Sequence, residues 1–132
     1  MTRLTITFLL LLVTAGAPAQ TFTTENIMSD AEKVTGYFMR NYPDVGADSY
    51  VGGKRRNSKI WTRGVFYEGL LNIYREQPRE EWLKYALDWG EYHNWISSSD
   101  NEARNANADY QCCGQAYLQL YRMNPAETVR ME

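Results

Sequence analysis

The chain has 132 residues, and its 14 lysine and arginine residues are slightly outnumbered by 16 aspartate and glutamate residues. A net charge of −2 argues against nucleic acid or an anionic membrane surface as a partner, because both are bound through clustered positive charge. The length allows one small domain.

The first 19 residues have the layout of a secretory signal peptide. Arg3 supplies a positive charge, residues 4–13 form a leucine-rich apolar run, and residues 17–19 (APA) resemble a cleavage site. The apolar run is shorter than the roughly 20 residues that span a bilayer. We therefore expect a signal peptide at 1–19, a mature domain at 20–132 without a membrane span, and a periplasmic or secreted location.

Helical periodicity dominates the rest of the chain. Apolar residues recur at helical spacing in segments that predict helices at 24–41, 61–75, 78–95 and 108–123. In the first of these, the residues that recur at helical spacing are Ile27, Ala31, Val34 and Phe38. Asn124 and Pro125 indicate the start of a fifth helix.

Residues 43–60 read as a loop that contains glycines and the basic run 54–56 (KRR). This run has the charge to meet an acidic sugar. The favoured interpretation is a solvated loop, because short charged runs usually face water.

A weak internal repeat predicts how the helices pair. Residues 71–75 (LNIYR) match residues 118–122 (LQLYR), and a repeat of about 40 to 50 residues is typical of stacked helical hairpins. The same offset pairs Thr62 with Asp109. We therefore expect an all-α fold of antiparallel helical hairpins, in which the second and fourth helices are neighbours and begin at the same end.

The residue types most often used in catalysis are sparse. His93, the only histidine, and the adjacent Cys112 and Cys113 are interpreted as packing residues, because consecutive helical side chains point about 100° apart and cannot easily form a disulfide. The chain shows no metal-ligand spacing and no nucleophilic triad, so no metal and no cofactor are expected. Aromatic residues make up 14% of the chain and fit either a sugar-stacking surface or, as the favoured interpretation, a helical core.

Asp109 is the carboxylate that stands out. It lies at the start of the fourth predicted helix, among small and aromatic residues. Two interpretations remain open from its position alone. The favoured interpretation is that it caps the helix, where the free N–H groups stabilise a negative charge; the alternative is that it serves as a catalytic carboxylate.

Three ordered segments resemble a known enzyme family. Residues 61–71 (WTRGVFYEGLL), 85–90 (YALDWG) and 105–117 (NANADYQCCGQAY) are similar to motifs of unsaturated glucuronyl and rhamnogalacturonyl hydrolases, glycoside hydrolase families 88 and 105. The resemblance extends over roughly residues 25–125. It implies that the all-α chain is the N-terminal part of an (α/α)6 toroid.

The resemblance also implies a reaction. These enzymes remove a 4,5-unsaturated uronic acid from pectin- or glycosaminoglycan-derived oligosaccharides by hydrating a vinyl ether. Asp109 matches the first member of the family's aspartate pair, whereas the second position is Tyr110 here. Trp61 and Arg63 are expected to bind the substrate in the same cleft as Asp109.

The family's principal acid lies in a later Trp-x-Asp-Gly segment, which this sequence does not contain. The resemblance therefore predicts an enzyme fragment, truncated at the C-terminus and inactive alone. The alternative is a helical-repeat module that binds carbohydrate or protein.

Overall fold

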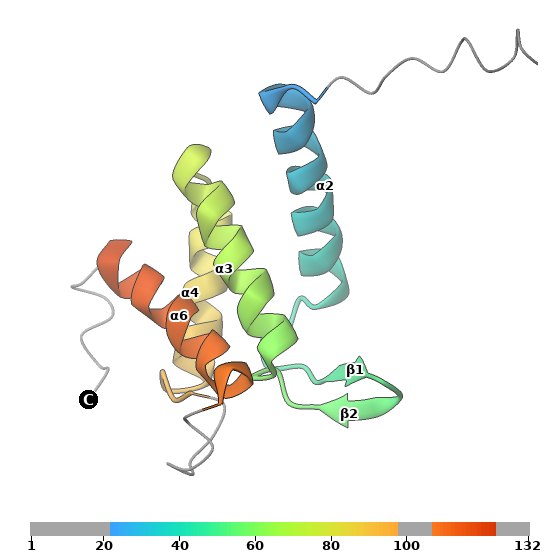
Figure 1. The fold of residues 1–132 in the computed structure, drawn as a ribbon, viewed down its shortest axis with the longest axis vertical. Coiled ribbons are helices and arrows are strands. Elements are labelled where there is room, and N and C mark those ends of the chain that lie inside the picture. Colours follow the sequence, from blue (N-terminus) through green and yellow to red (C-terminus); the bar gives the residue numbers. More distant parts are fainter. Residues whose placement is uncertain (1–21, 98–106, 124–132) are drawn as a thin grey trace, which may run out of the picture. The chain divides into compact units, whose positions relative to one another are not determined.

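The computed structural model describes residues 22–97 and 107–123. Its elements are α2 (Thr24–Asn41), β1 (Ser49–Val51), β2 (Lys54–Arg56), α3 (Trp61–Glu76), α4 (Glu80–Tyr92) and α6 (Ala108–Met123) (Figure 1). The all-α fold class is confirmed. The predicted signal peptide and fifth helix lie outside the described residues. Within the described ranges, no helix combines the length and the apolar character needed to cross a bilayer.

The chain divides into two compact units, Met1–Asp30 and Ala31–Glu132. The described part of the first unit is residues 22–30, which includes the first turns of α2. Thr23 caps this helix, because its Oγ1 accepts the backbone N–H of Asn26 at 3.2 Å.

Within the second unit, only part of the apolar set predicted for α2 packs against the rest of the unit. Phe38, a member of that set, stacks on Phe66 of α3 with ring centroids 3.5 Å apart. Val34, another member, is 64% exposed, whereas its neighbour Thr35 is 2% exposed. The buried side of the helix therefore includes a threonine that apolar periodicity does not single out.

The segment predicted as a loop at 43–60 contains a β-hairpin. β1 and β2 pair in antiparallel register, with Ser49 opposite Arg56. Gly52 and Gly53 join them with φ angles of 58° and 72°. A two-residue hairpin turn with φ positive at both central residues favours glycine, because other side chains are strained there. The Gly-Gly pair was therefore a hairpin signal in the sequence.

α4 is shorter than the predicted helix at 78–95. It begins two residues after Pro78 and ends at Tyr92. The end is a Schellman motif, in which Trp95 donates its N–H to Gly90 O and Asn94 donates to Glu91 O, both at 2.9 Å. Asn94 takes the left-handed conformation, with φ of 50°, that this motif requires.

The core lies between α3, α4 and α6. Its fully or almost fully buried residues are Tyr67, Leu70, Leu71, Trp82, Tyr85, Ala86, Trp89, Cys113, Ala116, Tyr117 and Leu120. Tyr67 and Trp89 stack with ring centroids 4.1 Å apart. The interpretation of the aromatic residues as core is confirmed for this set, and burial of such large rings supplies most of the driving force for packing.

Among the described elements, α3 and α6 make the most extensive contact, which confirms that these two helices are neighbours. The repeat is not followed residue by residue, however. Leu71 is fully buried, whereas its repeat partner Leu118 is 53% exposed. α3 is covered by α4 on one side and α6 on another, so it buries a wider face than α6 does.

Candidate active site

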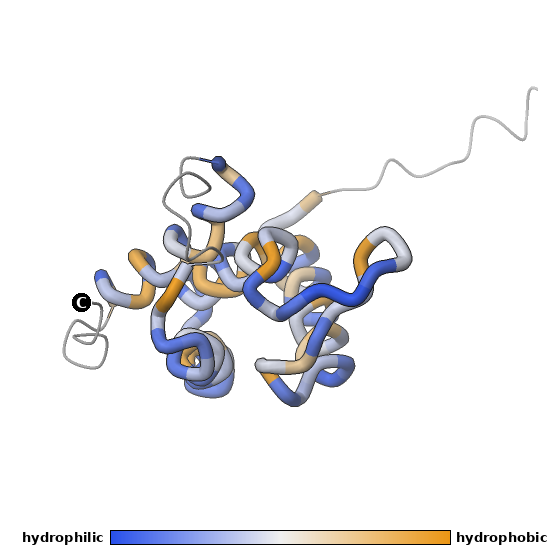
Figure 2. The backbone as a smooth tube through the Cα atoms, turned by 90° about the horizontal axis from the view of Figure 1, so that it is seen from below, coloured by the Kyte–Doolittle hydropathy of each residue, from blue (hydrophilic) through white to orange (hydrophobic). Residues whose placement is uncertain are grey.

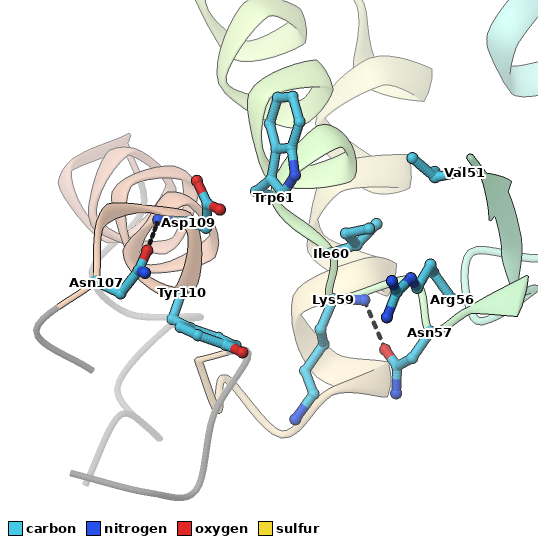
Figure 3. Close-up of a pocket in the computed structure, with 9 residues that line it drawn as sticks. All are labelled: Val51, Arg56, Asn57, Lys59, Ile60, Trp61, Asn107, Asp109 and Tyr110. Carbon is cyan, nitrogen blue, oxygen red and sulfur yellow. Dashed lines mark hydrogen bonds between the residues drawn. The ribbon is translucent and has the colours of Figure 1, made fainter. Parts of the chain in front are cut away.

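A pocket of about 490 Å³ lies where α3 and α6 begin (Figure 3). It is lined by Val51, Arg56, Asn57, Lys59, Ile60, Trp61, Asn107, Asp109 and Tyr110. These residues come from the hairpin, from the segment 57–60 that leads into α3, and from the first turns of α3 and α6. Both helices therefore begin at the same end of the unit, as the repeat predicted.

Asp109 reaches this pocket from the first turn of α6. The helix is capped by Asn107, whose Oδ1 accepts the backbone N–H of Asp109 at 2.9 Å. The interpretation of Asp109 as the cap is therefore wrong, because a neighbouring side chain already fills that role. The Asp109 carboxylate is exposed and faces the pocket, which is where a group that reacts with a ligand has to lie.

Two aromatic side chains contribute to the lining. Trp61, the first residue of α3, is 44% exposed, and Tyr110 follows Asp109 in α6. Figure 3 shows Asp109 and Tyr110 on the α6 side of the pocket and Trp61 above the opening between the two walls. An exposed indole ring is a suitable surface for the face of a sugar ring.

Arg63 does not line this pocket. It lies two residues after Trp61, which places the two side chains about 200° apart around the helix axis. Arg63 is 2% exposed and donates from Nε to Ser49 Oγ at 2.7 Å and from Nη2 to Ala47 O at 2.9 Å. Its guanidinium also stacks 3.9 Å from the ring centroid of Tyr42. The structure places Arg63 as the anchor of β1, on the side of α3 away from Trp61.

The segment 57–60 is held from behind by α4 and α6. Ser58 Oγ and His93 Nε2 share a hydrogen bond of 2.6 Å, and Trp89 Nε1 donates to Ser58 O at 3.1 Å. Cys113 donates from Sγ to Lys59 O at 3.1 Å. These buried contacts fix the backbone on which Asn57 and Lys59 present their side chains to the pocket.

His93 is a packed residue, as expected, and is 7% exposed. Burial, together with the nearby cations Lys59 and Arg63, lowers the pKa of its imidazole to about 4. The imidazole is therefore neutral at pH 7. Sequence reasoning did not anticipate that it would hold the pocket wall through Ser58.

Both cysteines are free thiols. Cys113 is fully buried in the core, and burial raises its pKa to about 12. Within residues 22–97 and 107–123, no group of three or more histidine, cysteine and acidic residues is arranged to hold a metal ion.

Comparison with known families agrees with the resemblance seen in the sequence. The sequence profile of Glycosyl Hydrolase Family 88 matches residues 30–132, which is well over half of the chain. The chain belongs to this family. No curated protein and no solved structure was found to match it.

Membership of Glycosyl Hydrolase Family 88 makes the chain a glycoside hydrolase by family, with a carbohydrate substrate. It favours the enzyme interpretation over a helical-repeat binding module. Among the described residues that line the pocket, Asp109 is the one carboxylate. The described lining residues therefore do not include the two facing carboxylates by which ordinary glycosidases displace a leaving group at the anomeric carbon.

Proposed function

We propose that this chain supplies part of the active site of a Glycosyl Hydrolase Family 88 enzyme that removes a 4,5-unsaturated uronic acid from the end of pectin- or glycosaminoglycan-derived oligosaccharides. The observation that carries the proposal is that Asp109 and Trp61, from different helices, line one pocket at the shared end of α3 and α6. A carboxylate beside an exposed aromatic ring suits proton transfer to a stacked sugar. The described helices would be the first hairpins of an (α/α)6 toroid.

The proposed reaction is hydration of a vinyl ether. An acid protonates the carbon–carbon double bond of the uronic acid ring, and water adds to the adjacent carbon. The resulting hemiketal opens and releases the rest of the oligosaccharide. Because water adds to the double bond and does not displace a group at the anomeric carbon, one well-placed carboxyl group can act first as acid and then as base.

In this scheme Asp109 is an active-site carboxylate and Trp61 is the surface against which the sugar ring packs. The resemblance assigns the principal proton donor to a Trp-x-Asp-Gly segment, which is missing from the sequence. We therefore propose that the 132-residue chain binds its substrate without turning it over.

The test uses an unsaturated disaccharide made by a polysaccharide lyase and follows the ultraviolet absorbance of its conjugated double bond. The 132-residue chain should leave this absorbance unchanged. In a longer chain that carries the complete domain, Asp109→Asn should lower turnover at least about 100-fold, the usual contribution of a positioned acid or base. Asp88→Asn is the matched control, because Asp88 is paired with Lys84 on the surface and does not line the pocket.

Two outcomes would contradict this assignment of Asp109. Turnover by residues 20–132 that is abolished by Asp109→Asn would show that Asp109 is the principal catalytic group. Full activity of the complete domain carrying Asp109→Asn would remove Asp109 from the mechanism.

A further inference from the structure

The wall of the pocket that faces Asp109 carries positive charge. Arg56, at the end of β2, and Lys59, in the segment 57–60, line the side of the pocket opposite α6 (Figure 3). The described lining residues thus include two cations and one carboxylate, although the chain as a whole has a net charge of −2. The excess of positive charge at the pocket therefore has the opposite sign to the net charge of the chain.

All three residues of the basic run 54–56 are exposed, as expected, but they lie in strand β2 and not in a loop. Alternate residues of a strand point to opposite faces, so Arg55 is separated from Arg56. Arg55 forms an ion pair with Asp48, whereas Arg56 lines the pocket beside Val51. No carboxylate among the described residues pairs with Arg56. The run appears as a continuous hydrophilic stretch in Figure 2.

Lys59 is held in place by its backbone. Its N–H donates to Asn57 Oδ1 at 2.6 Å, and its carbonyl accepts the thiol of buried Cys113. Its ammonium donates to the backbone carbonyl of Ser97 at 3.3 Å. That acceptor is uncharged, and no carboxylate among the described residues forms an ion pair with Lys59. The hydrogen bond to Ser97 already restrains the side chain, so less freedom is lost when the ammonium binds an anion.

The ring expected in this pocket brings a carboxylate close to Asp109. Two like charges in one pocket repel each other, and this repulsion opposes binding unless cations lie nearby. A neutral sugar has no charged group that could pair with Arg56 and Lys59. A uronate has one, because its carboxylate can accept charge-assisted hydrogen bonds from both side chains.

We propose that Arg56 and Lys59 form an anion subsite that binds the carboxylate of a terminal uronate ring, with Trp61 packing against the ring. The proposal rests on the proposed function and adds the residues that select an acidic sugar. It assigns the hairpin, which Arg63 anchors from the other side of α3, to substrate selection.

The test measures binding by the 132-residue chain with isothermal titration calorimetry. The ligand is an unsulfated unsaturated disaccharide whose only charge is the carboxylate of the terminal ring, and its methyl ester is the uncharged counterpart. The unmodified chain should bind the acid about tenfold more tightly than the ester. A hydrogen bond to a charged acceptor is stronger than one to a neutral acceptor, and the difference corresponds to about a tenfold ratio of dissociation constants. The Arg56→Gln/Lys59→Gln variant should lose this preference and bind the ester as before.

The control variant Lys54→Gln/Arg55→Gln removes two positive charges, as many as the Arg56→Gln/Lys59→Gln variant, but from hairpin residues that do not line the pocket. It should keep the preference for the acid. Equal affinity of the unmodified chain for acid and ester, or failure to bind either, would overturn the subsite, as would an unchanged preference in the Arg56→Gln/Lys59→Gln variant.

A further arm separates this proposal from the proposed function. The saturated disaccharide carries the same carboxylate but lacks the double bond. If it binds as tightly as the unsaturated one, and both lose affinity in the Arg56→Gln/Lys59→Gln variant, the anion subsite stands and the choice of an unsaturated substrate falls. If the chain binds the unsaturated disaccharide more tightly than the saturated one but binds acid and ester equally, the choice of an unsaturated substrate stands and the anion subsite falls.

Discussion

Gly64 of α3 lies directly against the backbone of Cys112 in α6. A Cβ atom at Gly64 would come within 2.9 Å of the Cys112 carbonyl carbon and within 3.0 Å of the Cys113 nitrogen. The two helices can approach this closely only because residue 64 has no side chain. Since both helices begin at the pocket, this contact fixes the separation between Trp61 at the start of α3 and Asp109 at the start of α6.

Gly64→Ala should lower the free energy of unfolding by about 1 kcal/mol. Overpacking against backbone costs roughly 1–3 kcal/mol, which outweighs the gain of up to about 1 kcal/mol in helix propensity. Gly69→Ala in the same helix is the control, because nothing lies within 4 Å of a Cβ there. It should raise stability by about 0.5–1 kcal/mol. Urea denaturation of the two variants decides the matter, and equal effects would show that α3 and α6 are not in close contact.

Arg63→Met should lower the free energy of unfolding by about 2–3 kcal/mol. The substitution leaves the hydroxyl of Ser49 and the carbonyl of Ala47 without their buried donor, and each such loss costs about 1–3 kcal/mol. Arg55→Met, on the exposed side of the hairpin, should cost less than about 1 kcal/mol. Amide hydrogen exchange provides a second measurement. Protection of the hairpin should fall in Arg63→Met more than protection of α4, and uniform loss across the chain would contradict the anchoring role.

Stability should fall when the pH is lowered from 7.5 to 5, because of His93. The unfolded chain takes up this proton near pH 6.5, whereas the folded chain resists it until about pH 4. The contribution of neutral His93 to the free energy of unfolding is therefore complete above pH 6.5 and is lost between pH 6.5 and 4. By pH 5 the loss from this group amounts to about 2 kcal/mol. His93→Gln keeps a polar partner for Ser58 and should show a weaker pH dependence over this range in urea titrations. An unchanged pH dependence would assign the effect to other groups.

The two thiols should react at very different rates with a disulfide reagent at pH 8. Cys113 is fully buried with its pKa raised to about 12, so it should react only when the chain unfolds. Cys112 is partly exposed, although burial and the charges of Asp109 and Glu68 raise its pKa. It should react slowly in the folded state. Cys112→Ser should abolish that slow phase, and a remaining native-state reaction would mean that Cys113 is accessible.

Local sequence predicted most of the helices well. The predicted helices at 24–41 and 108–123 have the observed bounds, and α3 extends one residue beyond its prediction. Helical periodicity and capping residues act over one or two turns, so a helix can be predicted from a single segment of the sequence. The errors fell at turns. The Gly52–Gly53 hairpin and the Schellman end of α4 at Asn94 each depend on a positive φ, which apolar periodicity does not report.

The sequence by itself determined the helical class, the neighbouring positions of α3 and α6, and the motifs that match Glycosyl Hydrolase Family 88. Only the tertiary structure decided which side chains meet in the pocket. Trp61 and Arg63 stand two residues apart in one motif, yet one lines the pocket and the other is buried against the hairpin. The helix turns about 100° per residue, so neighbours in sequence face different partners, such as Ser49 of the hairpin for Arg63 and Asp109 of α6 for Trp61.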